Sequence, residues 1–125
     1  MKFAFEDLEV WHLSLDLIDR VYEIADRLPQ DELYNLISQT KRAAISVSLN
    51  IAEGSGRHHK KDFGRFIRLS IGSLLEVAAS LKIAIRRDYI KQEEFGQNVS
   101  PLLEKLYFKL IALERPQDYH GQAEL

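Results

Sequence analysis

The sequence contains no cysteine, and it has only three prolines and six glycines among its 125 residues. Without cysteine the protein can form neither a disulfide framework nor a thiolate nucleophile, which fits a reducing compartment. Pro29 closes one long segment, and Gly54 and Gly56 close the next. The chain is therefore divided into a few long elements rather than many short ones.

The sequence also lacks a bias of charge and a long apolar run. Its 17 Lys and Arg against 19 Asp and Glu give a formal net charge of −2, so the whole chain is biased toward neither nucleic acid nor membrane. The opening MKFAFEDLEV has no apolar run of the kind expected of a signal peptide or a membrane span. With 46% hydrophobic and 29% charged residues, we expect one globular domain in the cytoplasm, with no membrane partner.

Apolar residues recur at spacings of three and four along four segments, which is the period of an amphipathic α-helix. The segments cover about residues 7–28, 31–53, 60–87 and 92–114. The first segment carries one apolar stripe of Leu8, Trp11, Leu15, Ile18, Tyr22 and Ala25, flanked by a second line of Val10, Leu17, Val21, Ile24 and Leu28. The other stripes begin at Leu33, Phe63 and Phe95. No segment alternates with the period of two that is typical of a strand.

The connections between these segments are short, so neighbouring helices must run antiparallel. The sequence therefore predicts an all-α protein, an antiparallel up-down-up-down four-helix bundle over residues 1–114. Pro101 lies inside the fourth segment, where it removes a backbone hydrogen bond, and predicts a kink or a restart at Ser100. Residues 115–125, RPQDYHGQAEL, are predicted to form a flexible C-terminal tail.

The stretch RAAISVSLNIAEGSGR, residues 42–57, is apolar on almost every side of a helix. On a helix over residues 39–53, the polar residues Gln39, Arg42, Ser46, Asn50 and Glu53 fall on one line. A helix this apolar and this rich in small residues is expected to be buried on two faces. One face serves the bundle, and we expect the other to contact a neighbouring subunit.

The third segment carries a matching line that includes Arg65, Ser73 and Glu76. If the turn centres near residues 57 and 58, two residues that lie side by side on the antiparallel helices have sequence numbers that add up to about 115–118. We therefore predict the ion pairs Arg42–Glu76 and Glu53–Arg65, because an unpaired buried charge costs several kcal/mol. The predicted polar network consists of Arg42, Ser46, Asn50, Glu53, Ser73 and Glu76. Arg65 could instead face a ligand.

The glycines that follow this helix have two possible roles. Gly54 or Gly56 can adopt the left-handed conformation that ends a helix. A phosphate-binding loop would require a preceding strand and a GK[ST] ending, and GSGR has neither. The sequence thus favours a helix stop over a nucleotide site.

The strongest electrostatic feature is RHHKKDFGRFIR, residues 57–68, which we call the basic turn. It contains one aspartate and five cations, Arg57, Lys60, Lys61, Arg65 and Arg68. In a ring of subunits, copies of this turn would form a basic rim that could bind RNA or DNA phosphates. The alternative is a solvated turn whose lysines serve solubility.

No arrangement of residues supports catalysis or metal binding. His58 and His59 are adjacent and do not share a helix face, and no Ser–His–Asp set or di-iron Glu-x-x-His motif is present. The aromatic residues Trp11, Tyr22 and Tyr34 fall at helical spacing and are expected in the core or an interface. We expect no enzyme, no metal, no cofactor and no small-molecule substrate.

Several short motifs together resemble the 23S rRNA intervening sequence protein family, also called four helix bundle or S23 ribosomal proteins. The matching residues are Phe5-Glu6-Asp7-Leu8, Trp11, Pro29, Glu32, Tyr34, Leu36, Arg42-Ala43-Ala44, Asn50-Ile51-Ala52-Glu53-Gly54, Arg57, Phe63, Gly72-Ser73 and Glu76. The resemblance covers about residues 3–113. It implies a homopentamer of four-helix bundles, encoded within sequences that interrupt 23S rRNA genes, with no established biochemical function.

This family is similar to the accessory variability determinant proteins, basic bundles that contact nucleic acid and reverse transcriptase. The present chain departs from them because it is slightly acidic. Two hypotheses follow from the sequence. The first is a nucleic-acid-associated accessory protein that acts through the basic turn. The second is a protein-interaction scaffold without nucleic-acid binding, which presents its acidic first helix or its tail.

Overall fold

The computed structural model describes the backbone of residues 1–123 and the side chains of residues 1–114. Over these residues the protein is all-α, with no strand, which confirms the predicted class. The elements are a 3₁₀ turn η1 (Ala4–Asp7), α1 (Glu9–Ala25), a 3₁₀ turn η2 (Gln30–Glu32), a π-helical turn η3 (Leu33–Ile37), α2 (Ser38–Ser55), α3 (Lys60–Arg86), α4 (Gln92–Asn98) and α5 (Ser100–Ala123).

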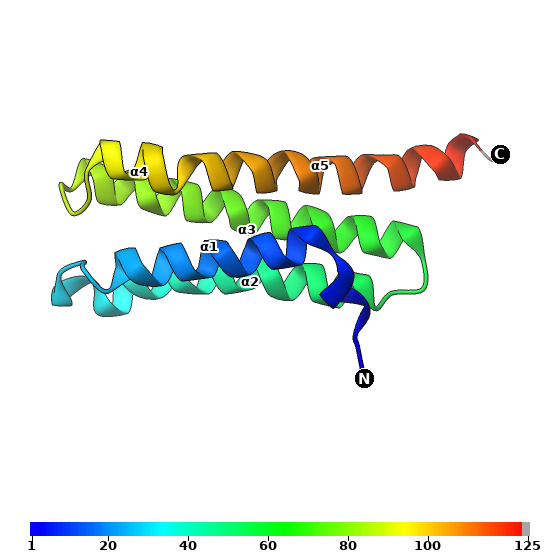
Figure 1. Cartoon of the computed structure of the whole chain (residues 1–125), viewed down its shortest axis with the longest axis horizontal. Coiled ribbons are helices and arrows are strands. Elements are labelled where there is room, and N and C mark those ends of the chain that lie inside the picture. The colour runs from blue at the N-terminus through cyan, green and yellow to red at the C-terminus, as the bar shows by residue number, and fades with distance from the viewer. Residues whose placement is uncertain (124–125) are drawn as a thin grey trace.

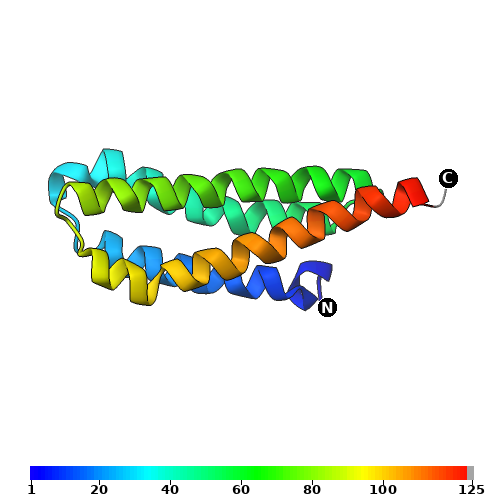
Figure 2. The same cartoon turned by 90° about the horizontal axis from the view of Figure 1, so that it is seen from above.

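The long helices lie lengthwise beside one another (Figures 1 and 2). α2 packs against α1 and α3, and α5 packs against α3 and α1, so the four enclose one core. The stripes predicted in the second, third and fourth segments supply this core. Its fully buried members include Val47, Ile51, Ile67, Leu74, Leu106 and Leu110.

The core line of α1 is the second of the two predicted lines, not the first. Val10, Leu17 and Val21 are buried, whereas Trp11 is half-buried and Tyr22 is exposed. The buried line passes through Ser14, whose hydroxyl donates a hydrogen bond to the carbonyl of Trp11. This polar residue interrupts the apolar periodicity, so the neighbouring line is the more regular one in the sequence.

The start of the second segment also differs from the predicted regular helix. It begins with η2 and η3, and α2 follows only at Ser38. A π-helical turn contains an extra residue and shifts the phase of the side chains. Leu33, predicted to face inward, is therefore exposed, and Tyr34 is 93% exposed rather than packed in the core.

The predicted restart at Ser100 is confirmed. α4 ends at Asn98 and α5 begins at Ser100, with Pro101 in its first turn, where a missing backbone N–H leaves no hydrogen bond broken. The helix continues to Ala123, through most of the segment 115–125. The flexibility of that segment stays a prediction, and residues 124–125 lie outside the described residues.

Gly54 does not end a helix in the left-handed conformation. None of the described glycines has a positive φ, so the left-handed conformation is wrong for both glycines, but α2 ends at Ser55 with Gly56 as its C-cap, so the predicted helix stop at this glycine pair is confirmed. Gly54 itself is buried within α2. Its lack of a side chain instead allows α3 to come close. A Cβ at Gly54 would lie 2.8 Å from the Cβ of Phe66 and 3.3 Å from Cδ1 of Phe63. At Gly72, on α3, a Cβ would meet nothing within 4 Å.

These two glycines give opposite expectations for the same substitution. Gly54→Ala should lower the free energy of unfolding by about 1–3 kcal/mol, because α2 and α3 must move apart. Gly72→Ala should raise it by up to about 1 kcal/mol, because alanine favours the helix and has room. Urea unfolding followed by circular dichroism measures both. Equal effects of the two substitutions would contradict the close contact at Gly54.

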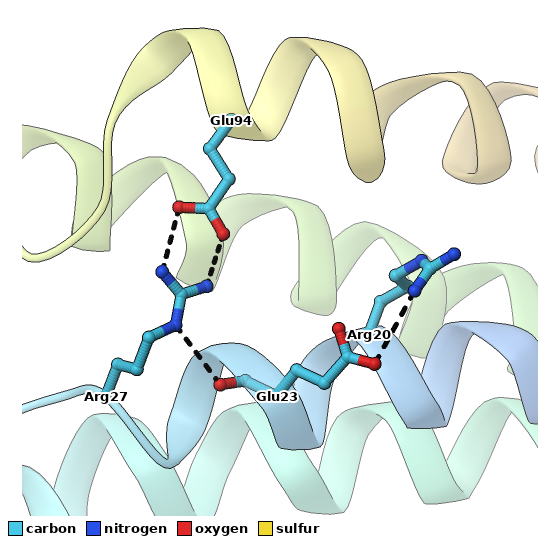
Figure 3. A network of polar contacts seen from close by, with 4 residues as sticks. All are labelled: Arg20, Glu23, Arg27 and Glu94. Carbon is cyan, nitrogen blue, oxygen red and sulfur yellow. Dashed lines mark hydrogen bonds and ion pairs between the residues drawn. The ribbon is translucent and has the colours of Figure 1, made fainter.

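Polar contacts tie together the end of the molecule that carries the α1–α2 and α3–α4 connections (Figure 1). Arg27 donates two hydrogen bonds to the Glu94 carboxylate, one of them 3.0 Å from Nη1 to Oε1, and a third from Nε to the Glu23 carbonyl (Figure 3). The Tyr89 hydroxyl donates to Glu32 at 2.8 Å. The hydrogen bonds from Arg27 lower the pKa of Glu94.

A carboxylate with a lowered pKa stabilises the fold above its unfolded pKa, near 4.3, and this contribution is lost as the pH falls through the folded pKa. Glu94→Gln should therefore cost up to about 1 kcal/mol at pH 7, and progressively less as the pH falls below about 4. Thermal unfolding across this range measures the difference. Glu93→Gln is the matched control, and an equal, pH-independent loss in both variants would contradict the role of the ion pair.

Candidate nucleic-acid interface

The basic turn connects α2 to α3 at the end of the molecule opposite the Arg27–Glu94 pair (Figure 1). Arg57, Lys60, Lys61 and Arg65 are all exposed. Among the described side chains, neither lysine nor Arg65 has a carboxylate within ion-pair distance. The turn therefore presents several cations that no side chain in the described part of the chain neutralises.

Two of these cations share one aromatic ring. The guanidinium carbons of Arg57 and Arg65 each lie 4.6 Å from the centroid of the Phe66 ring. Arg57 also donates to Glu53, with 3.1 Å between Nη2 and Oε2. We call Arg57 and Arg65 the arginine pair.

Arg68 belongs to a different environment. Its Nη1 donates to Oε1 of Glu114 on α5 at 2.8 Å, and the Glu114 side chain is largely buried. A charged group bonded to a sheltered carboxylate is costly to detach. The structure thus ties this member of the predicted site to the contact between α3 and α5.

A pocket of about 260 Å³ lies beside the arginine pair, between the turn and the N-terminal η1. Its lining residues, which define the turn pocket, are Ala4, Leu8, Gly54, Ser55, Arg57, His58, His59, Lys60 and Phe63. His59 caps α3 without a side-chain hydrogen bond. The lining of the pocket therefore combines apolar side chains with the cations of Arg57 and Lys60 and with two imidazoles.

The predicted polar network forms only at its centre. The Ser46 and Ser73 hydroxyls lie 2.8 Å apart across α2 and α3, and Asn50 Nδ2 donates to the Ser46 carbonyl at 2.9 Å. Arg42 and Glu76 are exposed and form no ion pair with each other within the described chain.

The two predicted ion pairs are wrong for this chain. Arg42 and Glu76 lie in solvent, so no burial cost forces them to pair. Glu53 binds Arg57, four residues along the chain, rather than Arg65 on the next helix. The four-residue spacing of Glu53 and Arg57 was the available signal for this pair. The arrangement of Arg65 over Phe66 leaves its charge without a carboxylate partner among the described residues.

Large apolar side chains are exposed on α2, α3 and α5. The members of this apolar face are Leu49, Leu69, Leu75, Ile83 and Phe108, with Phe108 exposed at 66%. An apolar groove of about 300 Å³ between α3 and α5 adjoins it. Exposed apolar side chains on neighbouring packed helices, beside an apolar groove, form a candidate protein interface.

Neither metal nor membrane chemistry is apparent in the described part of the chain. No three His, Asp or Glu side chains there are close enough together to hold a metal ion. No helix among the described residues is long and apolar enough to cross a membrane. Trp11 packs against Phe5, with 4.7 Å between ring centroids, rather than lying open as a stacking surface.

The fold and the basic turn define a small helical protein with a candidate anion-binding end. The sequence profile of the 23S rRNA-intervening sequence protein family matches residues 6–111, and the chain belongs to this family. The resemblance seen in the sequence is thus confirmed. No curated protein sequence matches the chain.

Proposed function

We propose that the protein is a non-enzymatic, homo-oligomeric accessory protein that binds RNA or DNA through the basic turn. The observation that carries this function is the exposure of Arg57, Lys60, Lys61 and Arg65 at one end of the molecule, where Glu53 is the only carboxylate among the described side chains within ion-pair distance of any of them. Cations of this kind neutralise phosphates and release counterions. The cytoplasmic location expected from the sequence belongs to this proposal.

The proposal includes the architecture in which these turns are presented. α4 and α5 together act as the fourth helix of an antiparallel up-down-up-down bundle, which the short connections and the lengthwise packing support. The apolar face supports self-association, with the pentamer of the family resemblance as the expected form. In a ring, each subunit would contribute one basic turn, and the phosphate contacts would add up.

Charge reversal at the turn tests nucleic-acid binding. Lys60→Glu combined with Lys61→Glu should weaken binding to a labelled rRNA stem-loop by at least about tenfold, and the wild-type affinity should fall steeply with salt. Fluorescence anisotropy at low and high salt measures both. Arg86→Glu with Arg87→Glu, at the other end of α3, is the matched control.

Two results would count against this function. Binding that survives the lysine reversals would remove the basic turn from the interface. Wild-type protein that binds no nucleic acid even at low salt would leave the second hypothesis, a scaffold that contacts other proteins.

Self-association is tested on the apolar face. Leu69→Asp should shift the protein from an oligomer toward a monomer at micromolar concentration, because a carboxylate would be desolvated in the contact. Light scattering coupled to size exclusion measures the mass. Tyr34→Asp, exposed at the opposite end of the molecule, should leave the oligomer intact. A monomeric wild-type protein would refute the oligomer.

A further inference from the structure

The arginine pair is held on a fixed support. Phe66 is only 9% exposed, and its Cβ is close enough to α2 that only glycine fits at position 54. Arg57 comes from the turn and Arg65 from α3, yet both guanidinium carbons lie 4.6 Å from the same ring centroid. The two charges therefore lie no farther apart than twice that distance. Each contact with the ring is stabilised by a cation–π interaction.

Of the two positive charges in the arginine pair, one has a carboxylate partner among the described residues. Glu53 binds Arg57, while no described carboxylate lies within ion-pair distance of Arg65. Two like charges held near each other repel, and an anion between them removes that repulsion. A phosphate suits this place because planar guanidinium groups donate two parallel hydrogen bonds to phosphate oxygens.

The turn pocket adjoins the arginine pair, because Arg57 is a member of the pair and also lines the pocket. Phe63 and the imidazoles of His58 and His59 line it, and such groups stack on bases. A base can enter such a pocket only when it is unpaired and unstacked. A duplex offers phosphates to the arginine pair, but its bases stay inside the helix.

We propose that the arginine pair binds a phosphate of single-stranded nucleic acid and that the turn pocket receives the adjacent unpaired base. This inference rests on the proposed function and names its ligand class. Glu53 competes with the phosphate for Arg57, so it lowers the affinity of the site. Removing its charge should make binding tighter.

The experiment uses the full-length protein and fluorescence anisotropy with a labelled 12-nucleotide single-stranded RNA and the matching duplex. The single strand should bind at least about fivefold more tightly than the duplex. Arg57→Ala and Arg65→Ala should each weaken single-strand binding by about tenfold and reduce the salt slope by about 0.7, the value for one phosphate contact on a single strand. Arg86→Ala, at the far end of α3, is the control and should stay within about twofold of wild type.

Glu53→Gln provides a test that misfolding cannot imitate, because it should tighten single-strand binding by about threefold or more. Phe66→Leu keeps an apolar side chain but removes the ring, and it should weaken binding as Arg65→Ala does. Thermal unfolding of each variant confirms that it is folded.

The outcomes separate this inference from the proposed function. If Lys60→Glu with Lys61→Glu abolishes binding while Arg57→Ala, Arg65→Ala and Glu53→Gln leave the affinity unchanged, the arginine pair is refuted and the basic turn stands. Equal affinity for single strand and duplex would refute the turn pocket as a base site. Wild-type protein that binds neither probe at low salt would overturn both proposals.

Discussion

The close contact between Gly54 and Phe66 is the constraint on which the functional end of the molecule depends. It brings the last turn of α2 against the first turns of α3, so only a short connection is needed between them. The same contact buries Phe66 while leaving its ring within reach of Arg57 and Arg65. Packing of the core and placement of the exposed charges therefore have one cause. A larger residue at position 54 would disturb both.

Farther along the same two helices, small polar residues fix how α2 and α3 align. The Ser70 hydroxyl is buried and donates to the Val47 carbonyl at 2.8 Å, and Ser46 and Ser73 meet at the edge of the contact. Small side chains allow the two backbones to approach, and their hydroxyls find partners, so burial leaves none of them unsatisfied. These contacts keep α2 and α3 closely packed beyond Gly54, along the length of the two helices.

Hydrophobic periodicity predicted most of the fold because each helix buries one regular stripe. It failed where a polar residue occupies the core line, as Ser14 does, and where the π-helical turn at Leu33–Ile37 shifts the phase. The cations of the candidate site were visible as a run of charge. The partners of these cations were not visible in the sequence. Two residues can lie at the same level of neighbouring helices, yet this does not determine whether their side chains are buried or exposed to solvent. Arg42 and Glu76 show this, and the shared ring of Phe66 required the three-dimensional arrangement.

The net charge of −2 says little about what the basic turn can bind. At physiological salt a charge is screened beyond about 8 Å. Leu8, which directly precedes α1, lines the turn pocket. Asp19 and Glu23, two acidic residues of α1, lie farther along this helix. A rise of 1.5 Å per residue puts Asp19 about 16 Å farther along the helix than Leu8. A phosphate at the arginine pair would therefore interact with the nearby cations and with Glu53, and hardly at all with the distant carboxylates Asp19 and Glu23.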